Sequence, residues 1–250
     1  MSKLLGNKTA LITGIRGGIG RAILELFAEN GANIYALLRS EDESFALYAA
    51  EIASKNNVFI KPVFADIRNE MEIKAAVSNI VKEKIPIDIL VNSAGVISKH
   101  SSFMMTKIET MKEVFDVNFF GTIFLTQLIS RYMIRNKSGV IINIASISGI
   151  DVDKSQLEYA CSKAALIMAT RKLADELFKN GIRVNAIAPG LTDTAMIKGL
   201  TEESLKYELG KTIMNRIMEP KEIAEVALFL ASEKSSSMTG RTLRTDGGGG

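Results

Sequence analysis

The sequence predicts an α/β protein built on a single doubly wound parallel sheet with helices on both faces. Short apolar runs of strand length alternate with longer segments in which apolar residues recur at helical spacing. Runs such as V-I-I-N-I are apolar at nearly every position, as strands are when helices cover both faces of a parallel sheet. Alternating strands and helices form right-handed βαβ units, which build one continuous sheet.

Strands and helices are expected in turn along the whole chain. We place the strands, as apolar runs of strand length, at 9–13, 33–38, 58–64, 87–91, 139–144, 183–188 and 241–245. We place the helices, from their apolar periodicity, at 19–29, 44–54, 70–83, 108–135, 156–178 and 220–231. No linker rich in Pro, Ser or charge interrupts this order, so residues 1–250 are expected to form one domain.

The composition excludes several functional classes. Apolar residues make up 47% of the chain and charged residues 24%, which excludes a disordered protein. The net charge is +3 and the basic residues are scattered, so no nucleic-acid surface is expected. The longest apolar stretch, 114–129, is short and contains Asp116, Asn118 and Gln127, which argues against a membrane span. The N-terminus lacks the apolar region of a signal peptide, so a cytoplasmic protein is expected.

A metal site is not expected. His100 is the only histidine and Cys161 the only cysteine, so a histidine-based zinc site lacks ligands. We read His100 as a loop residue and Cys161 as a packed thiol, and a single cysteine fits a reducing compartment.

A glycine-rich turn joins the first strand to the first helix. In T-G-I-R-G-G-I-G, Gly14, Gly18 and Gly20 permit a tight turn, a close approach of the backbone to a pyrophosphate, and close packing of helix on strand. The N–H groups at the start of the helix then face the phosphates. The alternative is an ordinary strand-to-helix turn, but its position at the start of a βαβ unit favours a Rossmann-type dinucleotide site.

The end of the second strand indicates which dinucleotide binds. Enzymes that use NAD place a carboxylate there to accept a hydrogen bond from the ribose 2′-OH. This chain has Leu38 and then Arg39, and an arginine pairs with a 2′-phosphate. Arg16, inside the glycine turn, offers a second positive contact. NADP(H) is therefore the predicted cofactor, although Arg39 as a solvated loop residue is the alternative.

Three polar residues near the middle of the chain predict hydride-transfer chemistry. Tyr159 and Lys163 are four residues apart and therefore share one face of a helix, and Ser146 precedes Tyr159 by thirteen residues. The Lys163 ammonium is expected to favour the Tyr159 phenolate, so that Tyr159 exchanges a proton near neutral pH. Together with the glycine turn, this pattern indicates an enzyme that moves a hydride between a nicotinamide cofactor and a carbonyl or alcohol carbon.

The chain resembles the short-chain dehydrogenase/reductase family over its whole length, and bacterial 3-oxoacyl-[acyl-carrier-protein] reductases within it. The matching segments are T-G-I-R-G-G-I-G (13–20), A-D-I (65–67), N-S-A-G (92–95), V-N-F-F-G (117–121), N-I-A-S (143–146), Y-A-C-S-K (159–163), R-V-N-A-I-A-P-G (183–190) and T-G-R-T-L-R-T-D-G-G (239–248). Their shared order makes an accidental match negligible.

The resemblance implies a role for each polar residue of these motifs. Tyr159 would be the general acid toward a carbonyl oxygen, and Ser146 would donate a hydrogen bond to the same oxygen. Lys163 would hold the nicotinamide ribose, and Asn118 would keep a water chain from Lys163 to solvent. Further cofactor contacts are implied at Ile19, Asp66, Ile67, Asn92, Gly95, Pro189, Thr192 and Thr194.

The resemblance also implies assembly. In that family the helices expected at 108–135 and 156–178 pair between subunits and the C-terminal segment contacts another subunit, which gives a homotetramer of two-fold symmetry. Candidate interface residues, with intramolecular core as the alternative, are Ile108, Met111, Val114, Phe115, Phe119, Ile123 and Leu125.

The segment before Tyr159 departs from the carrier-protein reductases. It carries Asp151, Asp153 and Glu158 near the expected mouth of the site, where small neutral residues are commoner. Because carrier proteins are acidic, these carboxylates work against docking. They would instead suit a hydroxyl-rich substrate.

The expected docking positions also differ. The resemblance implies that reductases which dock a carrier protein present arginines before the fifth and sixth strands. This chain has Lys137 and Asn180 there, with Lys179 adjacent.

Three functions stay open. A reductase of 3-oxoacyl thioesters linked to an acyl-carrier protein is the first choice, and a reductase of a sugar, polyol or other small carbonyl compound is the second. A catalytically silent NADP-binding regulator is the third, but all four catalytic positions are filled.

Overall fold

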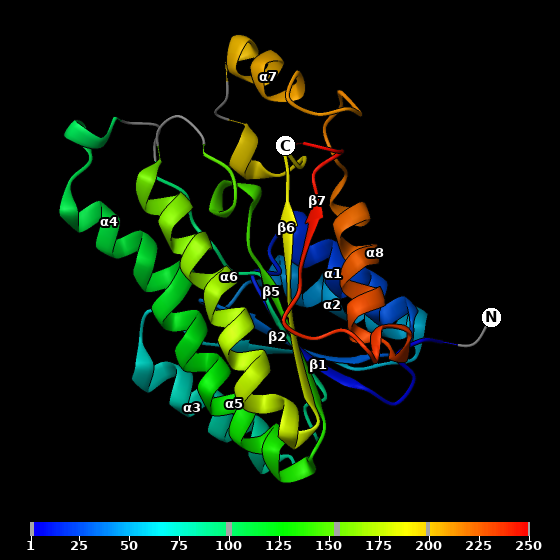
Figure 1. Ribbon diagram of the computed structural model, residues 1–250. Coiled ribbons are helices and arrows are strands. Elements are labelled where there is room, and N and C mark those ends of the chain that lie inside the picture. The colour runs from blue at the N-terminus through cyan, green and yellow to red at the C-terminus, as the bar shows by residue number, and fades with distance from the viewer. Residues whose placement is uncertain (1–2, 99–101, 153–155, 199–200, 250) are drawn as a thin grey trace.

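Seven parallel strands form one sheet in the order β3-β2-β1-β4-β5-β6-β7. Figure 1 shows this sheet among the helices that cover it. The computed structural model describes residues 3–98, 102–152, 156–198 and 201–249. The strands are β1 (Thr9–Thr13), β2 (Asn33–Leu38), β3 (Ile60–Phe64), β4 (Ile89–Asn92), β5 (Gly139–Ile144), β6 (Ile182–Pro189) and β7 (Thr242–Thr245). The sequence places all seven, although β3 and β4 begin two residues later than expected. Pro62 is tolerated in β3 because that strand is at the edge of the sheet.

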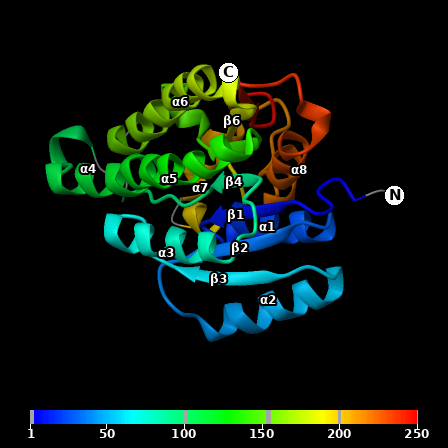
Figure 2. The same cartoon turned by 90° about the horizontal axis from the view of Figure 1, so that it is seen from below.

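Helices cover both faces of this sheet, which confirms the predicted fold class. They are α1 (Gly18–Glu29), α2 (Glu43–Asn56), α3 (Glu70–Lys82), α4 (Ile108–Phe115), α5 (Thr122–Asn136), α6 (Leu157–Leu177), α7 (Glu202–Leu209) and α8 (Pro220–Ala231). Figure 2 shows α1 and α8 on one side of the sheet and α3, α4, α5 and α6 on the other. None of the helices in the described residues is long and apolar enough to cross a membrane.

The two faces of the sheet carry separate apolar cores. Successive side chains of β1, such as Leu11 and Ile12, enter opposite cores because neighbouring residues of a strand point to opposite faces of the sheet. The core around Ile12 includes α1, α2 and α8, and the core around Leu11 includes α3, α5 and α6.

Capping residues lie at the N-termini of several helices. Asp42 and Asn69 accept hydrogen bonds from backbone N–H groups in the first turns of α2 and α3. At α8, Pro220 occupies the first turn, and Glu219 and Glu222 form a reciprocal capping box. These caps satisfy N–H groups that no helical carbonyl can reach.

The structure differs from the sequence-based expectation in two helical regions. The single helix expected at 108–135 is α4, a π-helical segment (Asp116–Gly121) and α5 in succession. At the end of the π-helical segment, a Cβ on Gly121 would lie 2.0 Å from the Ile67 carbonyl oxygen, so the backbone packs directly against that loop. Helix α7 was not expected, although Thr201, followed by two glutamates, caps it as a helix start signal would.

Candidate active site

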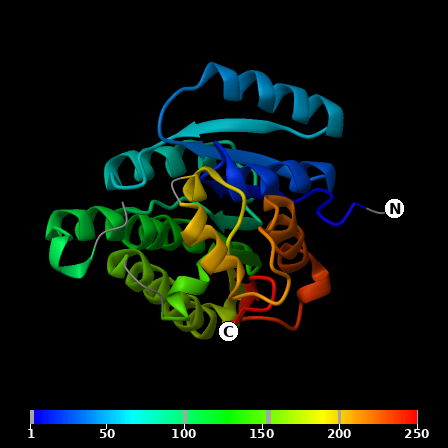
Figure 3. The ribbon, with the colours of Figure 1, turned by 90° about the horizontal axis from the view of Figure 1, so that it is seen from above.

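A cavity of about 920 Å³ opens at the carboxyl ends of the strands. Its walls come from the turns after β1, β4, β5 and β6 and from α7, which lies over the strand ends in Figure 3. Strands β2 and β4 flank β1 on opposite sides, so the order of the sheet reverses there, and a crevice forms at such a point. Of the predicted site residues, the cavity is lined by Gly14, Arg16, Gly18, Ile19, Gly20, Gly95, Ser146, Tyr159, Lys163, Pro189, Thr192 and Thr194.

The glycine turn fits a dinucleotide. Gly14 has φ of +71°, and a Cβ there would lie 2.7 Å from the backbone of Ser93 and Ala94. A Cβ on Gly20 would lie 2.3 Å from the Gly14 carbonyl oxygen, and one on Gly18 would lie 2.8 Å from Thr194 Cγ2. These three positions therefore need glycine, and their lack of a Cβ lets a pyrophosphate approach the backbone at the N-terminus of α1.

Thr13 holds the two sides of the crevice together. Its hydroxyl oxygen accepts hydrogen bonds from the backbone N–H groups of Ser93, at 3.0 Å, and Ala94, at 2.9 Å. The turn after β1 is thereby fixed against the turn after β4. Sequence reasoning did not assign Thr13 a role, although Thr13 is the first residue of the quoted glycine motif.

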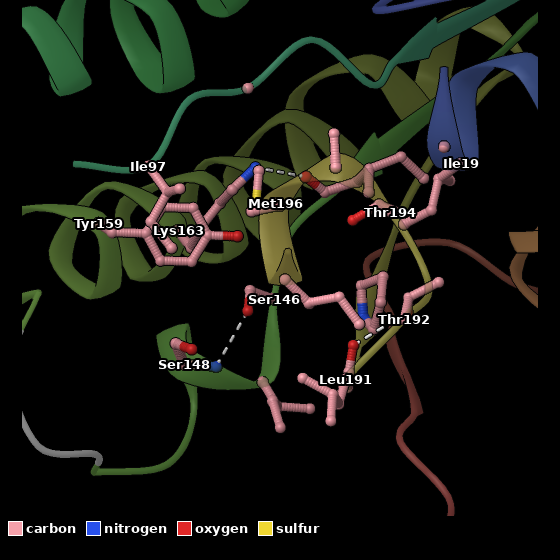
Figure 4. A pocket seen from close by; sticks show the side chains of 18 of the residues that line it. Ile19, Ile97, Ser146, Ser148, Tyr159, Lys163, Leu191, Thr192, Thr194 and Met196 are labelled. Atoms are coloured by element: carbon pink, nitrogen blue, oxygen red, sulfur yellow. Dashed lines mark hydrogen bonds between the residues drawn. The ribbon is translucent and has the colours of Figure 1, made fainter. Parts of the chain in front are cut away.

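Lys163 is buried at the base of the cavity, where Figure 4 shows it beside Tyr159. Its ammonium donates a hydrogen bond to the Ile144 carbonyl oxygen at 2.8 Å and lies 5.7 Å from the centre of the Tyr159 ring. Burial lowers the pKa of Lys163 to about 8, because the charged form loses its hydration. Gly95 leaves room for this group, since a Cβ there would lie 3.3 Å from Nζ.

The protonation of Tyr159 differs from the prediction that Lys163 favours its phenolate. Burial raises the pKa of its hydroxyl, and a hydrogen bond from Ser146 offsets only part of that rise. Because the phenolate is disfavoured, Tyr159 carries its proton at neutral pH. Ser146 Oγ accepts a hydrogen bond from the Ser148 backbone N–H at 3.2 Å (Figure 4), so its own proton is the one donated toward Tyr159 or, in its place, toward a substrate oxygen.

Asn118 lies behind Tyr159 and Lys163 in the π-helical segment. Its side chain pairs with both backbone groups of Val96, accepting from N–H at 2.8 Å and donating to the carbonyl at 3.0 Å. It also donates to Ser162 Oγ at 3.0 Å, and Ser162 donates to the Tyr159 carbonyl at 2.7 Å. Asn118 is fully buried and does not line the cavity. Through these hydrogen bonds it connects the loop after β4 to α6.

Asn92 was expected to contact the cofactor, but it does not line the cavity. Its buried amide donates to Thr126 Oγ1 at 2.9 Å and to Asn143 Oδ1 at 2.8 Å. Asn143 in turn donates to Thr170 at 2.8 Å. Asn92 thus joins β4 to β5 and α5, and the neighbouring Ser93 and Gly95 reach the cavity instead.

The arginines expected to meet a 2′-phosphate lie beside the glycine turn. Arg16 lines the cavity, donates to the carbonyl and hydroxyl oxygens of Ser40 at 3.0 Å each, and lies 3.3 Å from the Asp42 carboxylate. Arg39 is exposed just after β2 and outside the cavity lining. Its guanidinium makes no hydrogen bond or ion pair with another of the described residues.

Asp66 and Ile67, expected at the adenine, lie at the end of β3 outside the cavity lining. Asp66 is paired with Arg68 at 2.6 Å, and this guanidinium holds the pKa of the carboxyl below its usual range. Ile67 is buried, and its carbonyl packs against Gly121. An adenine contact at these two residues stays a prediction.

Two of the carboxylates expected at the mouth, Asp151 and Glu158, do not line the cavity. Asp151 is engaged by Arg244 through two hydrogen bonds, at 2.8 and 2.7 Å. Glu158 is buried at the start of α6, where it accepts a hydrogen bond from Ser98. Asp153 lies outside the described residues, as does His100.

Two further expectations change with the structure. Lys137 and Lys179 precede β5 and β6, so they lie at the amino ends of these strands, opposite the cavity. The loops that carry them touch, because a Cβ on Gly181 would lie 2.3 Å from the Lys137 carbonyl oxygen. Cys161 is exposed on α6, so the prediction of a packed thiol is wrong. Tyr159 and Lys163 occupy the inward face of the same helix turn.

Apolar side chains surround the polar pair. The lining includes Ile97, Ile147, Leu191, Met196, Ile197 and Tyr207. Met196 and Ile197 belong to the segment after β6, which the sequence analysis assigned to the cofactor through Thr192 and Thr194. Tyr207 belongs to α7, which it did not assign to the site. The cavity therefore combines an acid–base pair, a pyrophosphate turn and a lid of mixed character, because Glu203, Ser204 and Glu208 of α7 line it beside Tyr207.

Comparisons with known proteins agree with this geometry. Residues 14–249 match the family model described as enoyl-(acyl carrier protein) reductase. The 3-oxoacyl-[acyl-carrier-protein] reductase FabG of Thermotoga maritima is 37% identical, with 98% of each chain covered. The oxidoreductase UcpA of Salmonella typhimurium is 39% identical, covering 99% of this chain and 96% of that one.

The fold is also that of solved relatives. A short-chain type dehydrogenase/reductase from Mycobacterium marinum superimposes with a TM-score of 0.91 at 30% identity, covering 98% of this chain and 96% of that one. The site binds a nicotinamide cofactor in this family. This chain, with its glycine turn, Ser146, Tyr159 and Lys163 around one cavity, belongs to the short-chain dehydrogenase/reductase family and is an oxidoreductase acting on alcohol or ketone groups.

Proposed function

We propose that this chain is an NADPH-dependent reductase of 3-oxoacyl thioesters. The observation that carries the proposal is that the apolar side chains of Ile97, Ile147 and Met196 line the same cavity as Ser146 and Tyr159. An acyl chain buried there gains about 25 cal/mol per Å² of apolar surface, whereas sugar hydroxyls would lose hydrogen bonds to water. The neutral Tyr159 hydroxyl supports the reductive direction, because a reduction needs a proton donor.

The residues of the chain supply the proton, the polarisation and the placement. The nicotinamide cofactor, when bound, supplies the hydride that the carbonyl carbon accepts. Tyr159 gives its hydroxyl proton to the carbonyl oxygen, which becomes the alcohol of the product. The Ser146 hydroxyl donates a hydrogen bond to the same oxygen and stabilises its developing negative charge. Lys163 places a positive charge 5.7 Å from the tyrosine ring, which stabilises the transient phenolate.

The choice of NADPH is supported by the end of β2. Leu38 offers no carboxylate to a ribose 2′-OH, and the Arg39 guanidinium has no ion-pair partner among the described residues. We expect NADPH to bind at least about tenfold more tightly than NADH, a difference of about 1.4 kcal/mol. Fluorescence titration with both cofactors measures this. Equal affinities would contradict the proposal, and an Arg39→Ala variant that kept the preference would move the role to Arg16.

The substrate class is tested by NADPH oxidation across a panel. The panel holds a soluble acetoacetyl thioester, the matching enoyl thioester, a keto-sugar and a small ketone. We expect the 3-oxoacyl thioester to give the highest kcat/KM. Activity on the enoyl thioester alone would mean that a carbon–carbon double bond is reduced. Turnover of the keto-sugar without turnover of the acetoacetyl thioester would overturn the thioester proposal.

A reductase of sugars or polyols is the second candidate, and two carboxylates favour it. Glu203 and Glu208 of α7 line the cavity, where they can accept hydrogen bonds from hydroxyl groups. Glu208 already pairs with Lys211 at 2.8 Å. If this candidate is correct, Glu203→Gln lowers activity on the keto-sugar and leaves a thioester unaffected. The third function, a silent regulator, is disfavoured because the acid–base residues are assembled.

Docking of an acyl-carrier protein at Lys137 and Lys179 stays a prediction. Both lysines lie at the amino ends of β5 and β6, so within one chain they do not flank the cavity. Replacing both by Glu should raise KM for a carrier-linked substrate and leave a small thioester unchanged if another subunit brings them to the entrance. An unchanged KM for both substrates would remove the two lysines from the docking surface.

A further inference from the structure

The unusual carboxylate Asp151 has a partner far along the chain. Arg244 in β7 donates from Nη1 to Asp151 Oδ1 at 2.8 Å and from Nη2 to Asp151 Oδ2 at 2.7 Å. The two residues are 93 positions apart, and both are only partly exposed. A bidentate arginine–carboxylate pair fixes orientation as well as distance. It therefore holds the turn after β5 and strand β7 in one geometry.

Arg244 also organises the C-terminal segment 244–249. Its guanidinium donates to Asp246 Oδ2 from Nε at 2.8 Å and from Nη2 at 2.6 Å, and to the Gly249 carbonyl oxygen at 2.7 Å. Asp246 is buried, and its other oxygen accepts from the Gly248 N–H at 3.2 Å. Asp151 and Asp246 together raise the pKa of Arg244, so the guanidinium stays charged.

On one side, Arg244 holds the turn that carries Ser146. The Asp151 and Ile150 N–H groups both donate to the Ile147 carbonyl at 2.8 Å, and the Gly149 N–H donates to the Ser146 carbonyl at 3.1 Å. The turn is therefore one hydrogen-bonded unit. Strand β5 fixes it at Ser146, and Arg244 fixes it at Asp151.

On the other side, the C-terminal segment supports two more walls of the cavity. The Gly190 N–H donates to the Thr245 carbonyl at 2.9 Å, and a Cβ on Gly190 would lie 2.8 Å from Asp246 Cα. The Met214 N–H, in the segment after α7, donates to the Gly247 carbonyl at 3.0 Å. Arg244 thus lies where the Ser146 turn, the Gly190 turn and the base of the lid meet.

We propose that Arg244 is a positioning residue for the reaction, which through Asp151 and Asp246 holds the Ser146 hydroxyl in register with Tyr159. Arg244 and Asp151 do not line the cavity, so neither touches the substrate. The proposal depends on the oxidoreductase activity of the family and not on the identity of the substrate. Failure of the thioester proposal would therefore leave it intact.

The experiment compares Asp151→Asn, Arg244→Met and the double variant with the parent protein. Asp151→Asn keeps Arg244 and Asp246 together, so it tests the link even if Arg244→Met does not fold. We expect kcat on the best substrate of the panel to fall at least about tenfold in Arg244→Met, because small displacements of a reacting group are costly. KM and the Kd of NADPH should stay within about twofold. The double variant should be no slower than Arg244→Met, since both changes break one link.

A second measurement needs no substrate. Hydrogen–deuterium exchange should become at least about tenfold faster in the amides of 147–151 in both single variants. Lys61→Met is the matched control, because it removes an ion pair with Glu83 at the β3 edge, away from the cavity. It should change neither measurement. Unchanged exchange and kcat in Asp151→Asn would overturn the proposal. The proposal would also be overturned if the folded Arg244→Met variant lost stability, cofactor binding and kcat to the same extent, because such a uniform loss is expected of a purely structural residue.

Discussion

Lys163 is a lysine almost completely enclosed by protein, and its neighbours are the Ile144 carbonyl and the ring of Tyr159. Burial acts on both members of the pair in the direction of the neutral form, lowering the pKa of the amine and raising that of the phenol. The phenol therefore keeps the proton that a carbonyl oxygen needs. At the scale of the residue, desolvation sets the direction of proton transfer.

The depressed pKa of Lys163 makes stability depend on pH. Between about pH 8 and 10.5, the unfolded chain holds a proton that folded Lys163 has released. The free energy of unfolding contributed by Lys163 therefore rises with pH, by up to about 3 kcal/mol. Relative to the parent, Lys163→Met should be stabilised at pH 7, and this advantage should shrink toward pH 10. Urea unfolding of the cofactor-free protein measures it, and a constant difference would show that Lys163 has an ordinary pKa.

Tyr159→Phe should keep the fold and the affinity for NADPH but lose about 10²-fold or more in turnover, since only the proton donor is removed. Steady-state kinetics and a cofactor titration separate the two effects. Ser146→Ala should likewise leave cofactor affinity unchanged, whereas Lys163→Ala should also weaken it. Substantial turnover by Tyr159→Phe would assign the proton to another group.

At the scale of the element, the π-helical segment between α4 and α5 decides where Asn118 lies. The extra residue in a π-turn rotates the following side chains, and such turns often mark functional sites. Here it lets the Asn118 amide meet both backbone groups of Val96 while Gly121 packs on the Ile67 carbonyl. The helix, the loop after β4 and α6 are thereby joined by one side chain.

Gly121→Ala tests this packing. A Cβ at 121 would lie 2.0 Å from the Ile67 carbonyl oxygen, so the π-helical segment or the loop must move. We expect a loss of about 1–3 kcal/mol in the free energy of unfolding, together with reduced turnover because Asn118 moves with the segment. Gly210→Ala is the control, since the nearest atom to its Cβ would be 3.4 Å away. Equal stability of the two variants would show that Gly121 is not a tight contact.

At the scale of the whole molecule, large apolar side chains remain exposed on one group of helices. Ile108, Phe120 and Met168 are each more than half exposed on α4, the π-helical segment and α6. Val114 and Leu125, expected as interface candidates, are buried within the chain instead. The exposed residues are typical of a surface that another subunit covers.

The predicted assembly is a two-fold-symmetric tetramer, of about four times 27.2 kDa. Light scattering at micromolar concentration measures it. Replacing Phe120 and Met168 together by Glu should give a smaller particle, because charge at an apolar interface is costly. Leu47→Glu is the control, since Leu47 is 76% exposed on α2, outside the predicted interface. A parent mass of 27.2 kDa would contradict the tetramer, and a dimer would retain only the helix pairing.

The sequence by itself determined the parallel sheet, the family, and the residues at the base of the cavity. Apolar periodicity reports local burial, and the glycine turn with Ser146, Tyr159 and Lys163 lies at short, characteristic spacings. Only the tertiary structure decided the pKa of Tyr159, the break at Gly121, the lid of α7, and the pairing of Asp151 with Arg244. Each of these depends on atoms from segments distant in the chain, as the separation of 93 positions from Asp151 to Arg244 shows. No local pattern records which distant group desolvates, displaces or neutralises a given side chain.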